Sequence, residues 1–177
     1  MVTLIAAMDK NRLIGTGQGG LPWHGIPRDK KHLRDYTAGK ALLLGRRTFE
    51  EMPGWFGKDD RPIVITRNPA YRPGEDCFVA GGFDQALDLA VEFGRDELVV
   101  CGGAEIYRLT LPFADRLVLT LLHGSFHTKT GGVFFPEWQE EEFEEVKRED
   151  FEADSGTPLS MTFLHLTRRR GGKHPDC

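Results

Sequence analysis

Cysteine is scarce in this sequence of 177 residues, which contains only Cys77, Cys101 and Cys177. An odd number of cysteines without metal-ligand spacing argues against both a disulfide framework and a metal site. Reduced thiols are typical of proteins in a reducing compartment. We therefore expect a cytoplasmic protein that binds no metal.

The sequence also lacks long apolar runs and a strong excess of one charge. Its opening residues, MVTLIAA, contain no basic region of an export signal, and no later run approaches the length of a membrane span. A formal net charge of -4, from 23 Lys and Arg against 27 Asp and Glu, argues against a general affinity for nucleic acid or membrane surfaces. We expect neither partner, so any anion-binding site must be local.

Neither an internal repeat nor a linker interrupts the chain before its polar C-terminal end. This length suits one domain with one core, because domains typically have about 100–200 residues. We expect residues 1–168 to form that domain, residues 169–177 to form a disordered tail, and the protein to be a monomer.

Short β-branched and leucine-rich runs alternate with helical segments. The predicted strands are 2–8, 41–45, 62–66, 97–101, 116–122 and 159–166, and the predicted helices are 28–37, 47–52, 83–93 and 105–111. The nearly continuous apolar runs 2–8, 41–45 and 97–101 are typical of central strands buried on both faces. We expect an α/β fold with a mostly parallel sheet, flanking helices and a C-terminal antiparallel hairpin, whose two strands are joined by an acidic, non-periodic stretch at 137–152.

Glycine-rich turns follow two of the buried strands, where open α/β sheets bind ligands. GRRT at 45–48 places two guanidinium groups and a hydroxyl at a helix start, and GGAEIY at 102–107 lets the backbone approach a pyrophosphate. Arg67 follows the strand at 62–66 and would join the same edge, where arginines distinguish NADPH from NADH through the 2′-phosphate. Neither turn matches G-x-G-x-x-G, each is also consistent with a plain turn, and the arginines are also consistent with solvated surface charges.

Asp29 is the candidate acid. It lies in the first turn of a helix, where any carboxylate is favoured by the helix dipole. However, Leu33 shares its helix face and Trp23 precedes it, so we expect partial desolvation that raises its pKa. Such a carboxylate is suited to hold a proton or to bind an amidine-like ring edge.

Taken together, these residues resemble the dihydrofolate reductase family over almost the whole chain. The ordered motifs that carry the resemblance are LIAAM at 4–8, RLIG at 12–15, LPWH at 21–24, PRD at 27–29, GRRTFE at 45–50, ITR at 65–67, GGAEIY at 102–107, LT at 119–120 and FFP at 134–136. The resemblance implies hydride transfer from NADPH to dihydrofolate, with Asp29 as the only acid of the substrate cleft.

The resemblance also implies a role for each matching position. Asp29, Leu21 on a mobile loop and Trp23 beside a water would be catalytic. The substrate contacts would be Ile5, Ala6, Asp29, Leu33, Met52, Phe56, Arg61, Cys101 and Thr120. The cofactor contacts would be Ala7, Ile14, Gly15, Gly45, Arg46, Arg47, Thr48, Thr66, Arg67, Gly102, Gly103, Ala104, Glu105, Ile106 and Tyr107, with a cis peptide between the glycines of the pair.

Several positions depart from the family pattern. The loops at 16–20 and 24–26 each hold an extra residue, Lys30 follows the acid where an apolar residue is common, and the stretch before Arg61 lacks the usual Arg-x-Asn. Gly131-Gly132 lacks the acidic residue that often holds the mobile loop, and Cys101 is interpreted as a small buried hydrophobe. Two alternatives stay open: a reductase of another pterin- or pyrimidine-like heterocycle, and a catalytically silent nucleotide-binding protein.

Overall fold

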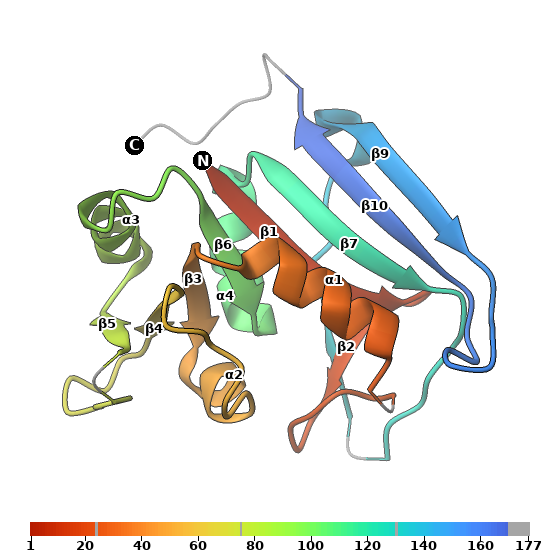
Figure 1. Ribbon diagram of the computed structural model, residues 1–177, viewed down its shortest axis with the longest axis horizontal. Helices are drawn as coiled ribbons and strands as arrows, with labels where there is room; N and C mark the ends of the chain where they lie inside the picture. Colours follow the sequence, from red (N-terminus) through yellow and green to blue (C-terminus); the bar gives the residue numbers. More distant parts are fainter. Residues whose placement is uncertain (24, 75, 130, 170–177) are drawn as a thin grey trace.

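An eight-stranded sheet forms the centre of the protein in the computed structural model, which describes residues 1–169 apart from 24, 75 and 130 (Figure 1). Its strand order is β5-β4-β3-β6-β1-β7-β10-β9, and the first six strands in this order run parallel. The strands are β1 (Val2–Asp9), β3 (Ala41–Gly45), β4 (Arg61–Ile65), β5 (Phe78–Ala80), β6 (Leu98–Gly102), β7 (Arg116–Leu122), β9 (Phe143–Phe151) and β10 (Met161–Arg168). The predicted mostly parallel sheet and the antiparallel pairing of β7 with β10 are confirmed.

Helices cover both faces of the sheet. The helical elements are α1 (Pro27–Thr37), α2 (Arg46–Glu50), α3 (Phe83–Glu92), α4 (Ala104–Thr110) and the 3-10 turns η1 (Leu111–Phe113) and η2 (Glu140–Glu142). In Figure 1, α1 crosses in front of the sheet and α4 lies behind it. Among the described residues, no helix is long and apolar enough to cross a membrane.

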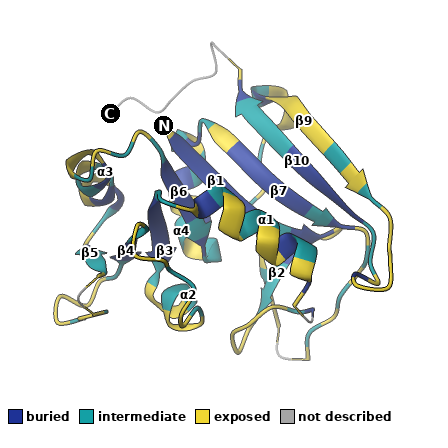
Figure 2. Cartoon of the chain, in the orientation of Figure 1, coloured by how far each residue is buried: buried dark blue, intermediate teal, exposed yellow. Residues whose placement is uncertain are grey.

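Successive side chains of β1 point to opposite faces of the sheet and pack in two different hydrophobic cores. Leu4 and Ala6 belong to the core packed under α3 and α4, whereas Ile5 faces the core under α1. Figure 2 shows the central strands buried along most of their length, while the edge strand β9 is mostly exposed. Burial on both faces explains why the central runs lack a polar alternation.

The predicted connection at 137–152 is wrong, because it contains strand β9. Its sequence, FEEVKREDF, carries charged residues on both faces, and Val146 is exposed. β9 is an edge strand that is held by backbone pairing with β10. Its sequence therefore has no alternation of apolar and polar residues by which a strand could be predicted. The short β5 and the separate two-stranded ribbon of β2 (Leu13–Thr16) and β8 (Gly132–Phe134) were also not predicted.

The predicted tail, 169–177, falls on residues that lie outside the described part of the chain, except for Arg169. The backbone N–H of Arg169 donates to the carbonyl of Glu142 at 2.8 Å, and its side chain donates to the carbonyl of Phe143 at 3.2 Å. Arg169 therefore contacts the segment at 142–143, and the domain boundary after residue 168 stays a prediction.

Two histidines pack between α1 and the sheet. The His32 ring stacks on Phe163, with 4.0 Å between ring centroids, and lies 5.7 Å from the ring of His165. Neither buried Nε2 atom has a hydrogen-bond partner among the described residues. Burial lowers the pKa of both histidines. Mutual repulsion and the charge of Lys147 lower the pKa of His32 further, while Glu149 and Asp35 partly offset this.

We expect the thermal stability to fall as the pH drops below about 6.5, the ordinary pKa of histidine. Because the pKa of each histidine is lowered in the folded state, the neutral imidazoles stabilise the fold above about pH 6.5. This contribution is lost as the pH falls from there through the folded-state pKa. The variant His32→Phe should lose less of its thermal midpoint than the wild type between about pH 8 and 5. Replacement of the exposed His127 by alanine is the control, and equal losses in all three proteins would refute the prediction.

Candidate active site

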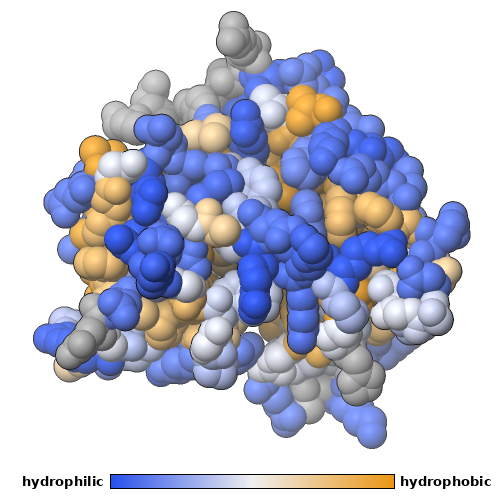
Figure 3. Space-filling view, viewed as in Figure 1, coloured by the Kyte–Doolittle hydropathy of each residue, from blue (hydrophilic) through white to orange (hydrophobic). Residues whose placement is uncertain are grey.

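The carboxyl ends of β1, β3, β4 and β6 meet at one edge of the sheet. In Figure 1 this edge faces the lower part of the picture, where α2 and β2 are found. Figure 3 shows the molecular surface hollowed along the same lower edge, between the regions of α2 and β2. The edge is therefore both the place where the predicted site residues gather and a concave part of the surface.

Asp29 is held in this region by the first turn of α1. Pro27 begins the helix, and the Asp29 side chain faces the sheet with 9 % of its surface exposed. Burial raises the pKa of Asp29, and a hydrogen bond with Thr120 and the positive charge of Lys30 offset part of that rise. Thr120 is in place because β7 pairs with β1 in a register that sets it beside Ala7.

An apolar cluster forms the floor of the cleft beside Asp29. Its members are contributed by β1, β3, β6, β7, α1, α2 and the α2–β4 segment, and five of them were predicted to contact the substrate: Ile5, Leu33, Met52, Phe56 and Cys101. Burial raises the pKa of the Cys101 thiol to about 12, so this side chain is protonated near neutral pH. It acts as a small hydrophobe there, consistent with the sequence interpretation.

Two predicted substrate contacts do not join this cluster. Ala6 points to the opposite face of the sheet, into the core under α3 and α4. Arg61 lies at the start of β4, and its Nη1 donates to the carbonyls of Lys58 at 3.0 Å and Asp60 at 2.9 Å. The guanidinium of Arg61 is therefore engaged by its own loop.

The loop after β2 carries Leu21, which is half exposed at 50 %. Gly19 and Gly20 give this loop its shape, with φ values of +100° and +76° that only glycine adopts readily. The Gly20 N–H donates to Oε2 of Glu51 at 3.1 Å, which ties the loop to the end of α2. Sequence reasoning missed Glu51, because its partner lies 31 residues earlier in the chain and no local pattern marks the contact.

Trp23 follows this loop and is buried. Its ring packs against Phe126, with 5.3 Å between ring centroids, and its Nε1–H has no acceptor among the described residues. A buried indole N–H without a protein partner fits a group that donates to water or to a bound ligand. The place of Trp23 beside a water near the acid stays a prediction.

The two glycine turns meet at this edge with little space between them. A Cβ at Gly45 would lie 3.2 Å from the Ile106 side chain, and a Cβ at Gly103 would lie 3.2 Å from Oγ1 of Thr48. The Gly102–Gly103 peptide is cis, as the resemblance implies, and α2 and α4 both begin here without a side-chain cap. Free backbone N–H groups beside glycines fit a pyrophosphate, so the residues present suit a dinucleotide.

Tyr107 is fixed beneath the glycine pair. Its hydroxyl donates to the carbonyl of Ile5 at 2.6 Å, and its ring lies within 3.3 Å of where a Cβ at Gly102 would stand. Burial raises the pKa of Tyr107 well above its ordinary value, so the hydroxyl remains protonated. The remaining predicted cofactor positions lie at the end of β1, on β2 and in the first turn of α4: Ala7, Ile14, Gly15, Ala104 and Glu105.

Three arginines follow β3 and β4. Arg46 forms an ion pair with Glu50 at 3.3 Å and lies over the ring of Tyr71, 6.0 Å from its centroid. Arg47 and Arg67 are exposed and form no ion pair with other described residues. Thr66, which precedes Arg67, accepts a hydrogen bond from Asn68 at 3.2 Å. The cluster leaves several guanidinium N–H groups available for a phosphate monoester.

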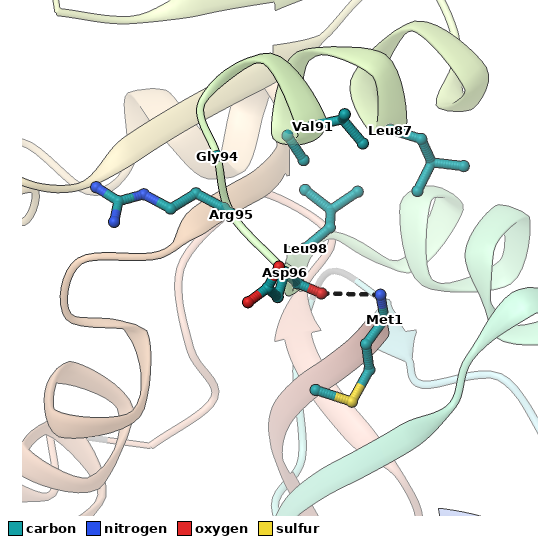
Figure 4. Close-up of a pocket in the computed structure, with 8 residues that line it drawn as sticks. Met1, Leu87, Val91, Gly94, Arg95, Asp96 and Leu98 are labelled. Atoms are coloured by element: carbon teal, nitrogen blue, oxygen red, sulfur yellow. Dashed lines mark hydrogen bonds between the residues drawn. The ribbon is translucent and has the colours of Figure 1, made fainter.

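A separate cavity of about 370 Å³ lies near the chain start, where β1 and β6 begin (Figure 4). Leu87, Val91 and Leu98 line it, and the Met1 ammonium donates to the Asp96 carbonyl at 2.9 Å. β1 and β6 are parallel, so this cavity is at the end of the sheet opposite Asp29 and the glycine pair. It is therefore not part of the candidate site.

Comparison of the sequence with known protein families assigns the chain to one of them. The family described as dihydrofolate reductase matches residues 1–168. The chain belongs to the dihydrofolate reductase family. Relatives include the dihydrofolate reductase type 3 of Salmonella typhimurium, 34 % identical with 96 % of this chain and 99 % of the relative covered. The dihydrofolate reductase of Bacillus subtilis is also 34 % identical, with 98 % of each protein covered.

The fold agrees with that of a solved dihydrofolate reductase. The enzyme from Enterococcus faecalis, complexed with NADP(H) and RAB-propyl, superimposes with a TM-score of 0.83 at 29 % identity. The alignment covers 95 % of this chain and 96 % of that structure. The dihydrofolate reductase fold predicted from the sequence is thus confirmed.

Proposed function

We propose that this chain reduces dihydrofolate to tetrahydrofolate with NADPH, and that Asp29 is the acid of its substrate cleft. The observation that carries the assignment is the position of Asp29, a buried carboxylate that is hydrogen-bonded to Thr120. It lies beside the apolar cluster and at the same edge of the sheet as the glycine pair. This reaction supplies tetrahydrofolate to one-carbon metabolism. Membership of the family and the NADP(H)-bound relative support NADPH as the cofactor.

The proposed role of Asp29 is to bind and polarise the pterin ring. Its carboxylate accepts hydrogen bonds from the amino group and a ring N–H of the substrate, and Thr120 keeps it in the required orientation. The negative charge raises the basicity of the imine nitrogen next to the carbon that accepts the hydride. A water near Trp23 delivers the proton to that nitrogen, and NADPH supplies the hydride.

The remaining residues position the ligands and exclude water. Leu21 lies over the reaction centre and shields it from water. The hydrogen bond between Gly20 and Glu51 holds the Leu21 loop against the end of α2. The cofactor phosphates are assigned to the turns at 45–48 and 102–107, with Arg46, Arg47, Thr66 and Arg67 at the adenosine end. Ile5, Leu33, Met52 and Phe56 hold the pterin and the aminobenzoyl ring.

An absorbance assay tests this function directly. NADPH loss is followed with and without dihydrofolate, and we expect rapid oxidation only when dihydrofolate is present. Oxidation with another pterin- or pyrimidine-like heterocycle but not with dihydrofolate would favour a different reductase on the same fold. Binding of NADPH without oxidation by any acceptor would show a silent nucleotide-binding protein.

We further propose that the reductase works as a cytoplasmic monomer whose catalytic domain spans residues 1–168. The reduced thiols, the small net charge and the extent of the family match support this proposal. Sedimentation equilibrium at micromolar concentration should give the mass of one 19.9 kDa chain. A dimer mass would refute the monomer.

A further inference from the structure

Asp9 is a buried carboxylate to which the proposed reaction gives no role. It ends β1, with 2 % of its surface exposed. Burial raises the pKa of Asp9, but hydrogen bonds, chiefly from the backbone N–H groups of Phe126, Leu13 and Asn11, outweigh this effect, so the pKa is lowered. The side chain is therefore an anion near neutral pH, and its two oxygen atoms bond to different parts of the chain.

One of these atoms, Oδ1, shapes the turn between β1 and β2. It accepts the N–H of Asn11 at 2.8 Å and the N–H of Leu13 at 2.9 Å. Arg12, between them, has a φ of +63°, which is costly for a residue with a side chain, and its N–H donates to the Asp9 carbonyl at 2.9 Å. Oδ1 therefore has a local, structural role.

The other atom, Oδ2, bonds to a segment that is distant in the sequence. It accepts the N–H of Phe126 at 3.0 Å, in the connection between β7 and β8. Beside this bond, the Asn11 side chain donates to Oγ of Ser125 at 2.9 Å. Both bonds join the β1–β2 turn to this connection, but of the two only the bond from Asp9 fixes the backbone of Phe126.

Phe126 in turn packs against Trp23. Their ring centroids are 5.3 Å apart, and both residues belong to the apolar cluster that includes Ile26 and Leu122. The Trp23 Nε1–H is buried and has no acceptor among the described residues. No hydrogen bond within this part of the chain sets the direction of the indole N–H, so the direction depends on the side chains that pack against the ring.

We propose that Asp9 is a positioning residue for Trp23: its Oδ2 fixes Phe126, and the Phe126 ring fixes the direction of the Trp23 N–H. This inference rests on the proposed function, in which a water near Trp23 delivers the proton to the substrate. A water that is held by this N–H moves whenever the indole moves, and small displacements of a reacting group lower the rate strongly. Asp9 therefore acts on proton delivery without touching the substrate.

The variant Asp9→Asn separates the two roles of the carboxylate. The amide oxygen can accept the N–H groups of Asn11 and Leu13 and keep the turn, but the amide NH₂ then faces the N–H of Phe126, donor against donor. The rate of hydride transfer in a single turnover should fall about tenfold, while the KM values for dihydrofolate and NADPH change little. Asp9→Ser should act alike, because its single oxygen atom can bond the turn or Phe126 but not both.

Phe126→Leu removes the aromatic ring and keeps the backbone N–H that bonds to Asp9. It should lower the rate of hydride transfer by a similar factor. In the double variant with Asp9→Asn the two losses should not multiply, because both changes act through the same contact with Trp23.

A spectroscopic measurement follows Trp23 directly. The sequence contains three tryptophans, so labelling with fluorotryptophan should give three fluorine resonances in the NMR spectrum, which single Trp→Phe variants assign. The Trp23 resonance should move in Asp9→Asn, Asp9→Ser and Phe126→Leu, while those of Trp55 and Trp138 stay in place.

The matched control is Asn11→Ala, which removes the neighbouring bond to Ser125 and leaves Asp9 bonded to Phe126. It should change neither the rate of hydride transfer nor the Trp23 resonance. The proposal is overturned if the Asp9 variants leave that resonance in place, or if Asn11→Ala moves it equally, which would show a general loosening of the two loops. It is also overturned if the losses of Asp9→Asn and Phe126→Leu multiply.

The spectra are recorded without substrate, so they decide the positioning of Trp23 independently of the reaction. Wild-type protein that does not oxidise NADPH with dihydrofolate would instead refute the proposed function itself.

Discussion

Replacement of Asp29 by asparagine should lower the turnover of dihydrofolate by about 10²–10⁴-fold near neutral pH, the range that a positioned acid or base contributes. The amide keeps the size of the carboxyl group and a hydrogen bond with Thr120. It loses the negative charge that raises the basicity of the substrate's imine nitrogen. Asp29 is not among the proposed cofactor contacts, so NADPH affinity should change little. Steady-state turnover and NADPH fluorescence titration measure the two quantities.

A matched control for this variant is Asp35→Asn, which removes a carboxylate from the exposed side of the same helix and should keep wild-type turnover. If Asp29→Asn retains wild-type turnover, the assignment of the acid is wrong. If it loses turnover and NADPH affinity together, the carboxylate supports the fold of the cleft rather than the chemistry.

Loss of Arg46 and Arg67 together should raise the KM for NADPH by roughly 10²-fold, because in the proposed site each guanidinium donates a charge-assisted hydrogen bond to the 2′-phosphate. The KM for NADH should stay nearly constant, since NADH lacks that phosphate. The preference for NADPH should therefore shrink by the same factor. Steady-state kinetics with both cofactors measures this ratio.

The control for charge removal is Arg148→Ala, on the edge strand β9 at the far side of the sheet. It should leave both KM values unchanged. An equal rise in the KM for NADPH and for NADH in the double variant would show that these arginines contact a part that both cofactors share. An unchanged KM for NADPH would show that they are ordinary surface charges.

The sequence was most informative where burial is complete. The runs that became β1, β3 and β6 were recognised because both faces of these strands are covered and almost every residue is apolar. β9 was not recognised, because an edge strand is defined by backbone pairing and its side chains are nearly all charged. β5 has only three residues, too few for any period to be seen.

In the candidate site, too, local features were predicted from the sequence and contacts between distant segments were not. Asp29 and Leu33 were correctly expected on one helix face, because helical spacing is a local property. The contacts of Glu51 with the Leu21 loop and of Asp9 with Phe126 join segments far apart in the chain, so spacing gave no indication of them. Arg61 was assigned from its position alone, and the structure shows its guanidinium bound to neighbouring carbonyls.

The most direct test of Asp29 as the group that promotes protonation is the pH dependence of hydride transfer in a single turnover. In the wild type, the rate should fall as the pH rises, because the imine nitrogen is then less often protonated. In Asp29→Asn the midpoint of this fall should move to lower pH by about one unit or more, since the amide no longer stabilises the positive charge. An unchanged midpoint in Asp29→Asn would contradict the proposed role of Asp29.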